Sequence, residues 1–319
     1  MIEYEIINAD VIEGLKRFDN GVFDTCITSP PYYGLRDYGV PGQIGLEKTV
    51  EEYIARIVEV FREIRRVLKD DGTVWLNVGD SYATGTTAAR KQSKNPGVGA
   101  NRKEAQNSVP RIGTPAGCKT KDLIGVPWLL AFALRADGWY LRQDIIWEKP
   151  NPMPESVRDR CTKSHEYIFL LSKSPHYYFD IEAIKERAVS HKRQNASGIQ
   201  PPKVQEMKRL GMISARSNLS TDYEREFRNK RDVWTVPLKG FHGAHFAVFP
   251  PDLIRPCVLA GSRRGGNVLD PFAGSGTTVY VAVQEGRSAV GIELNSEYAE
   301  LARQTIESNI QQISFCQIT

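Results

Sequence analysis

The chain contains the segment Gly266-Asn267-Val268-Leu269-Asp270-Pro271-Phe272-Ala273-Gly274-Ser275-Gly276-Thr277-Thr278 near its carboxyl end. Its first part, ending at Asp270, has the pattern of a short buried β-strand. Gly274 and Gly276 allow a tight turn, because glycine adopts backbone conformations that other residues avoid. A helix is expected to begin at Thr277 and to run to about Glu285. The segment therefore predicts a strand, a glycine turn and a helix in succession, a unit typical of α/β folds.

A second strand is expected at residues 289–292, ending at Glu293. Glu293 follows Gly274 by 293 − 274 = 19 positions, close to the spacing at which an acidic side chain meets a ribose hydroxyl. No lysine follows the glycines, so the turn is not a P-loop, and the single G-x-G differs from the G-x-G-x-x-G of dinucleotide sites. Phe272 can supply an apolar wall. The pattern favours S-adenosylmethionine over NAD, with a plain helix-start turn as the alternative.

At the other end of the chain, the predicted strand 23–28 runs into Ser29-Pro30-Pro31-Tyr32. Proline cannot donate to a sheet ladder, so the strand must end there. The Ser29 hydroxyl and the Pro30 carbonyl can accept the two N–H bonds of an exocyclic amine, Pro31 stiffens the turn, and Tyr32 can stack on a base. Such a base must be flipped out of a duplex to reach a pocket. The alternative is a rigid proline turn without catalytic function.

The cysteines indicate neither a thiol nucleophile nor a metal site. The sequence has five, without a C-x-x-C pair or a nearby histidine at ligand spacing, and we expect no metal. A C5-methylating enzyme needs a Pro-Cys pair after a strand, whereas Pro256-Cys257 falls in a predicted helix. Reduced, mostly buried thiols are expected.

The remaining patterns alternate between strand and helix, with a helix at 11–18, a clear amphipathic helix at 50–68, a strand at 73–78 and a further helix at 123–134. If the chain is arranged circularly, four predicted strands end at one edge of one sheet, where α/β folds bind ligands. Those ends are at Asp10, Ser29, Asp270 and Glu293. Asp10 can accept from an adenine amine or cap the helix that follows it, and the sequence supports both equally. This arrangement requires the two termini to lie close together.

Composition predicts an ordinary globular protein with two basic insertions. The 319 residues carry a net charge of +4, and 41% are hydrophobic. Segment 85–121 has eight basic residues against one acidic, and segment 185–231 has twelve against five. Both are predicted to be insertions in a core formed by residues 1–184 and 232–319, with solvated linkers as the alternative. No secretion signal and no membrane-spanning run is evident, so a cytoplasmic protein is expected.

The paired motifs resemble the beta class of amino-methylating DNA methyltransferases, in which the catalytic motif precedes the cofactor motif. Further similar segments are His245-Phe246-Ala247-Val248-Phe249-Pro250, Trp147-Glu148-Lys149-Pro150-Asn151-Pro152 and Ser164-His165-Glu166-Tyr167. The resemblance implies a Rossmann-like α/β fold with a mixed, mostly parallel sheet and helices on both faces. It implies that Ser29, Pro30, Pro31 and Tyr32 form the catalytic motif. It also implies the following cofactor contacts: Asp10, Phe249, Pro250, Asp270, Phe272, Gly274, Gly276, Thr277 and Glu293.

The Ser-Pro-Pro-Tyr form is typical of cytosine-N4 enzymes, and adenine-N6 methylation is the alternative. A catalytically silent DNA-binding module and a small-molecule or protein methyltransferase are less favoured. The resemblance implies that 185–231 recognises the target sequence in double-stranded DNA, and that 85–121 is a second basic loop. His165 and Glu166 are interpreted as structural, with a role in the site as the alternative. A cognate restriction endonuclease is a candidate partner, and both a monomer and a homodimer are compatible with the sequence. A bacterial, archaeal or phage source is expected.

Overall fold

A computed structural model describes residues 2–35, 37–84, 114–188, 209, 226–238 and 249–316. The chain divides into two compact units, one made of Met1–Ala183 with Arg231–Thr319 and the other of Ile184–Lys230. We call the first the core unit. Most of the two basic insertions, and residues 245–248, lie outside the described residues, so the predictions made for them stay predictions.

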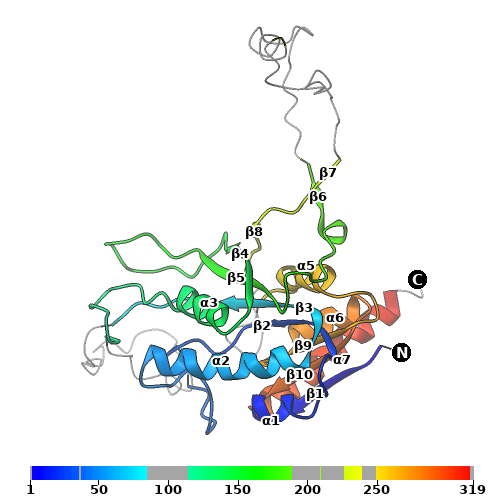
Figure 1. Cartoon of the computed structure of the whole chain (residues 1–319), viewed down its shortest axis with the longest axis horizontal. Helices are drawn as coiled ribbons and strands as arrows, with labels where there is room; N and C mark the ends of the chain where they lie inside the picture. The colour runs from blue at the N-terminus through cyan, green and yellow to red at the C-terminus, as the bar shows by residue number, and fades with distance from the viewer. Residues whose placement is uncertain are drawn as a thin grey trace, which may run out of the picture. The chain divides into compact units, whose positions relative to one another are not determined.

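The core unit is built on an eight-stranded sheet in the order β1-β10-β9-β2-β3-β5-β4-β8 (Figure 1). Its strands are β1 (Tyr4–Asn8), β2 (Phe23–Thr28), β3 (Leu68–Val78), β4 (Tyr140–Glu148), β5 (His165–Ser172), β8 (Val233–Thr235), β9 (Asn267–Asp270) and β10 (Ser288–Glu293). Neighbours from β1 to β3 are parallel, β5 is antiparallel to both β3 and β4, and β8 is parallel to β4. The predicted mixed, mostly parallel sheet is confirmed.

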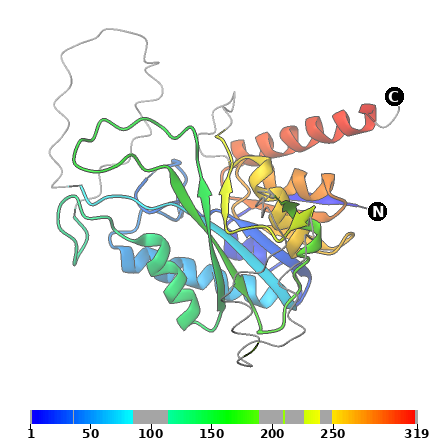
Figure 2. The same ribbon diagram turned by 90° about the horizontal axis from the view of Figure 1, so that it is seen from above.

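Helices cover both faces of this sheet (Figures 1 and 2). One layer contains α1 (Val11–Leu15), α2 (Val50–Val67) and α3 (Val126–Ala136), and the other contains α5 (Pro251–Gly261), α6 (Thr277–Gln284) and α7 (Ser296–Cys316). In α2 the apolar positions recur at helical spacing, and Ile57, Phe61 and Ile64 are fully buried. A short 3-10 turn, Glu182–Ile184, follows the last residues of β5 and its loop. The central strands β2, β3 and β9 are thus largely buried on both faces, as parallel strands require, whereas β4 and β8 keep exposed side chains.

The first and last strands of the core unit are neighbours. β1 pairs with β10 from Tyr4↔Ala289 to Asn8↔Glu293, and the Asn8 side chain donates to the Glu293 carbonyl oxygen at 2.9 Å. Figure 1 shows β1 beside α7. The predicted proximity of the two ends of the chain is confirmed, and the strand ends at Asn8, Glu293, Asp270 and Thr28 share one edge.

Three predicted boundaries were wrong, each because of a tertiary contact. α1 ends at Leu15 rather than Phe18, where the Arg66 guanidinium binds the carbonyl oxygens of both residues. β3 begins at Leu68 instead of after Gly72, because Leu68 is buried and pairs with Phe23 before a register shift. α3 begins at Val126 instead of Leu123, because the Asp80 carboxylate accepts the backbone N–H groups of residues 125 and 126.

The second unit has two short antiparallel strands, β6 (Glu186–Arg187) and β7 (Phe227–Arg228). Arg228 Nε lies 2.8 Å from the Glu186 carboxylate, and Ala188 N–H donates to the Glu226 carbonyl oxygen.

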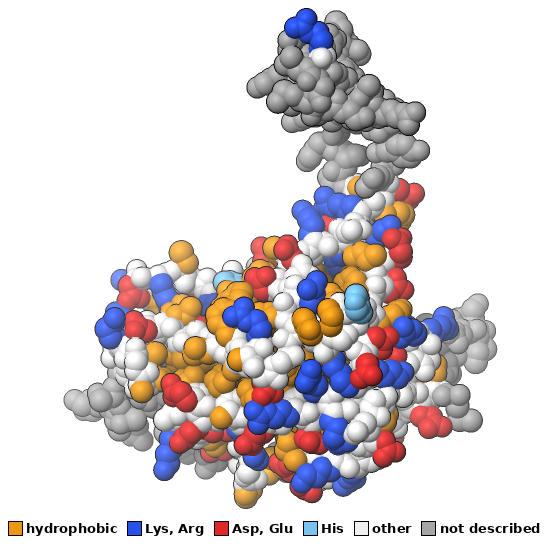
Figure 3. Space-filling view, in the orientation of Figure 1, with side chains coloured by type: hydrophobic (Ala, Val, Ile, Leu, Met, Phe, Trp, Pro, Cys, Tyr) orange, Lys and Arg blue, Asp and Glu red, His pale blue; other side chains and the backbone are white. Residues whose placement is uncertain are grey.

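On the face of the core unit seen in Figure 3, basic and acidic side chains are interspersed, as the small net charge predicts. Among the described residues, no helix has the length and apolar character needed to cross a membrane.

Candidate active site

The proline–tyrosine corner (Ser29–Tyr32) and the glycine corner (Asp270–Thr277) follow adjacent parallel strands, β2 and β9. Thr28 Oγ donates to Asp270 Oδ1 at 2.7 Å, and Thr278 Oγ lies 3.4 Å from the Ile27 carbonyl oxygen. Segments about 240 residues apart are therefore fixed side by side at the carboxyl edge of the sheet, where α/β folds bind ligands.

The glycine corner is organised by the Glu293 carboxylate. Glu293 accepts the backbone N–H of Gly274 at 2.9 Å with one oxygen and that of Asn295 at 2.8 Å with the other. Gly276 caps α6 with φ +80°, and a Cβ there would lie 3.1 Å from Ala302 Cβ. Each carboxylate oxygen keeps a free lone pair, so Glu293 can still accept from a ligand hydroxyl.

Of the other predicted cofactor residues, Phe272 and Thr277 belong to this corner, and Asp10 follows β1, which pairs with the strand that ends at Glu293. Phe272 is half-buried, and its N–H donates to Asp270 Oδ1 at 3.1 Å, while Thr277 is the first residue of α6. Phe249 and Pro250 immediately precede α5. Asp10 caps α1 by accepting from Ile12 N–H at 2.9 Å. Of the two roles predicted for Asp10, helix capping is therefore confirmed. Cofactor contact by any of these residues stays a prediction.

The proline–tyrosine corner is held from the side of α2. The fully buried Tyr53 donates through its hydroxyl to the Pro31 carbonyl oxygen at 3.0 Å, and the ring of Tyr33 packs against that of Tyr53. Tyr32 instead lies along Gly79, where an added Cβ would come within 2.6 Å of the Tyr32 ring. Ser29 is half-buried, and Pro30 is buried. The corner is thus rigid on one side and presents Ser29 and Tyr32 at the edge.

Three polar residues at this corner were missed as site residues by sequence reasoning. The Tyr32 hydroxyl lies 3.0 Å from Glu166 Oε2 and 3.3 Å from Asn77 Oδ1, and Lys149 Nζ lies 2.5 Å from Glu166 Oε1. Burial and the nearby Glu166 carboxylate raise the pKa of Tyr32 well above its usual value. Glu166 and Lys149 fall in two segments that carried the family resemblance, but only the β4–β5 register, Trp147↔Glu166, brings them together.

Asp270 is a buried carboxylate only partly satisfied by hydrogen bonds. Its Oδ1 accepts from Thr28 and Phe272, whereas within the described residues its Oδ2 has no partner. Burial raises the pKa of Asp270 from 3.8 to about 6, against the opposing effect of its hydrogen bonds. An unsatisfied buried acceptor at a ligand-binding edge fits a ligand that brings a donor or a positive charge.

The raised pKa makes a prediction about stability. Between about pH 4 and pH 6 the folded protein holds the Asp270 proton more tightly than the unfolded chain, so this group's contribution falls as pH rises. In ligand-free protein, the free energy of unfolding of wild type minus that of Asp270→Asn should therefore decrease by about 2 kcal/mol between pH 4 and pH 7. Urea titrations at several pH values measure this difference, and a pH-independent difference would contradict the assignment.

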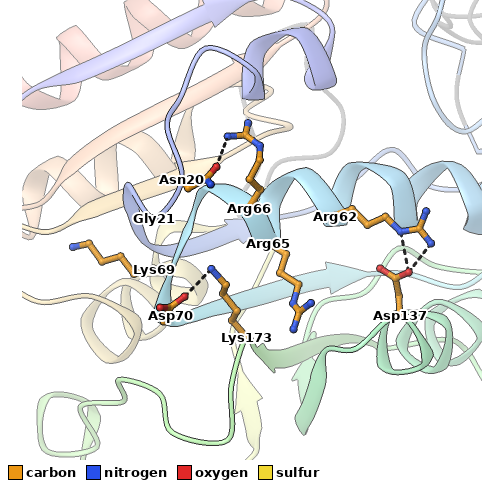
Figure 4. Close-up of a pocket in the computed structure, with 9 residues that line it drawn as sticks. All are labelled: Asn20, Gly21, Arg62, Arg65, Arg66, Lys69, Asp70, Asp137 and Lys173. Carbon is orange, nitrogen blue, oxygen red and sulfur yellow. Dashed lines mark hydrogen bonds and ion pairs between the residues drawn. The ribbon is translucent and has the colours of Figure 1, made fainter.

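A cavity of about 860 Å³ lies at the opposite edge of the sheet (Figure 4). It is lined by Asn20, Gly21, Arg62, Arg65, Arg66, Lys69, Asp70, Asp137 and Lys173. Several of its cations are paired within the protein, as in Arg62–Asp137 at 2.6 Å and Lys173–Asp70 at 3.1 Å. The arginines sit in the last turns of α2, where cations offset the partial negative charge of a helix end. This cavity is not part of the candidate active site.

Of the four cysteines whose side chains the structure describes, Cys26 and Cys257 are buried, Cys118 is half-buried and Cys161 is exposed, so the prediction of mostly buried thiols holds for two of them. Cys257 is buried within α5, as predicted, and burial raises the pKa of Cys26 well above its usual value. Among the described residues, no group of three or more His, Cys, Asp or Glu side chains is arranged to hold a metal ion.

Comparisons with known proteins agree with this geometry. The family model for DNA methylases of the N6 and N4 class matches residues 23–304. The chain is 50% identical to the type II methyltransferase M.SmaI of Serratia marcescens, over 95% of this chain and 90% of that protein. It is 47% identical to the type II methyltransferase M.Cfr9I of Citrobacter freundii, over 93% and 85%.

Two solved structures share the fold. A putative DNA modification methylase of Thermus thermophilus, solved with S-adenosyl-L-methionine, has a TM-score of 0.57 and 23% identity, with 97% of this chain and 96% of that chain covered. The PvuII DNA methyltransferase, described as cytosine-N4-specific, has a TM-score of 0.60 and 16% identity, with 97% and 90% covered. The match to the family model over most of its length, together with these close relatives, shows that the chain belongs to the N6/N4 family of DNA methylases.

Proposed function

We propose that this protein transfers a methyl group from S-adenosylmethionine to the N4 amine of a flipped cytosine in double-stranded DNA. The proposal rests above all on the Thr28–Asp270 hydrogen bond of 2.7 Å, which joins the proline–tyrosine corner to the glycine corner at one edge of the sheet. Methyl transfer requires the donor and the nucleophile to be held in line, and adjacent corners meet this requirement.

The cofactor would be held by the glycine corner and its neighbours. The turn from Gly274 to Gly276 lets the backbone approach a ligand, Glu293 can accept from a ribose hydroxyl, and Phe272 offers an apolar wall. The unsatisfied Asp270 Oδ2 adds an acceptor. Asp10, Phe249, Pro250 and Thr277 complete the proposed set. When bound, the cofactor supplies a methyl group already activated on a sulfonium.

The target amine would be held by the proline–tyrosine corner. An exocyclic amine is a poor nucleophile because its lone pair is delocalised into the ring. Acceptors at Ser29 Oγ and the Pro30 carbonyl oxygen would favour a pyramidal nitrogen whose lone pair faces the methyl group. The nitrogen forms its bond to carbon as the sulfur–carbon bond breaks, and the amine then loses one proton. Tyr32 would stack on the base and offset part of the cost of flipping it.

Cytosine is favoured over adenine by Ser29, which gives the corner its Ser-Pro-Pro-Tyr form. The PvuII enzyme of similar fold is described as cytosine-N4-specific, which supports the same choice. Recognition of the DNA sequence is assigned to segment 185–231, with loop 85–121 as a second basic contact. The relatives are named type II methyltransferases, so a cognate endonuclease remains a candidate partner.

The product identifies the reaction directly. Unmethylated genomic DNA is incubated with the protein and methyl-labelled cofactor, digested to nucleosides and separated by liquid chromatography with mass detection. We expect the label in N4-methyldeoxycytidine. Label in N6-methyladenine would instead support the alternative target, and label in 5-methylcytosine or in no nucleoside would refute amino methylation by this chain.

A further inference from the structure

A buried ion pair lies behind the proline–tyrosine corner and takes no part in the function proposed above. Lys149 just after β4 and Glu166 at the start of β5 are joined at 2.5 Å, and their side chains are only 14% and 17% exposed. The Lys149 ammonium also sits 4.2 Å from the centre of the Trp147 ring. Because removing charges from water is costly, a pair this buried calls for an explanation in terms of what it contacts.

The pair contacts the candidate active site through Tyr32. The Ser29 hydroxyl donates to the Tyr32 oxygen at 3.5 Å, near the outer limit for a hydrogen bond, and the Tyr32 hydroxyl donates to Glu166 Oε2 at 3.0 Å. A chain of hydrogen bonds thus runs from the serine at the edge of the sheet to Lys149 in the interior.

The direction of this chain is fixed by its inner end. A lysine ammonium only donates, and the Glu166 carboxylate that it contacts only accepts. The second neighbour of the Tyr32 hydroxyl, Asn77 Oδ1, is also an acceptor, because Asn77 Nδ2 donates to the Tyr167 carbonyl oxygen at 3.1 Å and to Glu166 Oε2 at 3.4 Å. The Tyr32 hydrogen must therefore point inward, towards β3 and β5.

The orientation of the Tyr32 hydroxyl also determines the orientation of the Ser29 hydroxyl. With its hydrogen turned inward, the Tyr32 oxygen offers lone pairs to the Ser29 hydroxyl, which can then donate to it. The lone pairs of Ser29 remain available to accept from an incoming amine N–H. Burial, which raises the pKa of Tyr32, keeps that hydroxyl protonated and able to donate.

We propose that Glu166, paired with Lys149, is a positioning residue that orients the Ser29–Tyr32 hydrogen-bond chain so that Ser29 acts as an acceptor for the target amine. This inference rests on the proposed function, although it applies equally to cytosine and to adenine amines. Glu166 does not touch the substrate, and its effect passes through Tyr32.

The test is the variant Glu166→Gln, which keeps the shape and removes the charge. Lys149 will hold the amide oxygen, so the amide NH₂ will face Tyr32 and will compete with the Ser29 hydroxyl for the lone pairs of the Tyr32 oxygen. We expect kcat to fall by about 10²-fold, with cofactor Kd unchanged within about twofold. Glu148→Gln is the matched control, because Glu148 lies at the end of β4 and bonds Thr235 instead of Tyr32.

A second variant separates positioning from a purely structural role. In Lys149→Met/Glu166→Gln the amide is free to turn its oxygen towards Tyr32, so this double variant should be about tenfold faster than Glu166→Gln alone. A purely structural pair predicts a double variant that is slower still, and that result would overturn the proposal. If Glu166→Gln misfolds, Tyr32→Phe offers the same test, because removing the hydroxyl should lower kcat about as much.

The wild-type enzyme in the same assay distinguishes the two proposals. A wild type that methylates no exocyclic amine in unmethylated plasmid DNA refutes the proposed function. If the wild type is active and both Glu166→Gln and Tyr32→Phe have a kcat within twofold of it, the role of Glu166 is refuted and the proposed function stands.

Discussion

Replacing Ser29 by alanine is expected to lower the methylation rate by about 10²–10³-fold and to leave cofactor binding unchanged. The hydroxyl oxygen is one of two proposed acceptors for the target amine, and it lies outside the glycine corner that would hold the cofactor. Ser29 is half-buried at the edge of the sheet, and its removal leaves the Tyr53–Pro31 hydrogen bond in place. Single-turnover rates with labelled cofactor, together with calorimetric titration of cofactor, measure the two quantities.

Ser81→Ala is the matched control for Ser29. Ser81 follows β3 at the same edge of the sheet, and its backbone carbonyl bonds Ile124 N–H whatever the side chain. Its loss should change the rate by less than about twofold. A Ser29→Ala enzyme with the wild-type rate would remove this hydroxyl from the mechanism.

The second large effect is expected from Glu293→Gln, which should weaken cofactor binding on the order of 100-fold. Both Glu293 oxygens accept backbone N–H groups, from Gly274 and Asn295. An amide has one oxygen, so its NH₂ will face one of these donors and distort the turn. The proposed acceptor for the ribose hydroxyl is lost as well. Cofactor titration in the absence of DNA measures the affinity.

Glu297→Gln provides the comparison for Glu293, since Glu297 is exposed in the first turn of α7 and undergoes the same chemical change. Its cofactor affinity should stay within about twofold of wild type. Equal losses in the two variants would attribute the effect to charge in general and would count against a specific role for Glu293.

The cofactor half of the fold could be predicted from sequence because its signals are local. A buried strand, two glycines and a helix start lie within 266–278, and the structure places β9, the turn and α6 there. Glu293 follows at a spacing set by one helix and one strand. Such short-range relations depend on backbone preferences that the chain itself displays.

The direction of β5 and the place of Glu166 could not be predicted in this way. The strand at 165–172 has the pattern of any buried strand, and the pattern does not say whether it runs parallel or antiparallel to β3. Glu166 reaches Tyr32 only because β5 is antiparallel, which brings its amino end to the edge where β2 ends. Tyr32 and Glu166 are about 130 positions apart, and the contact between them depends on strand pairing, which no local sequence pattern indicates.

The pairing of β1 with β10 also has a consequence for protein synthesis. A ribosome completes β1 and the proline–tyrosine corner early, but β9 and β10 are made only after more than 230 further residues. Folding of this half must wait for contacts between distant parts of the polypeptide, which form slowly. A nascent or prematurely terminated polypeptide therefore lacks the edge proposed to bind the methyl donor, and this edge is complete only once translation has passed β10.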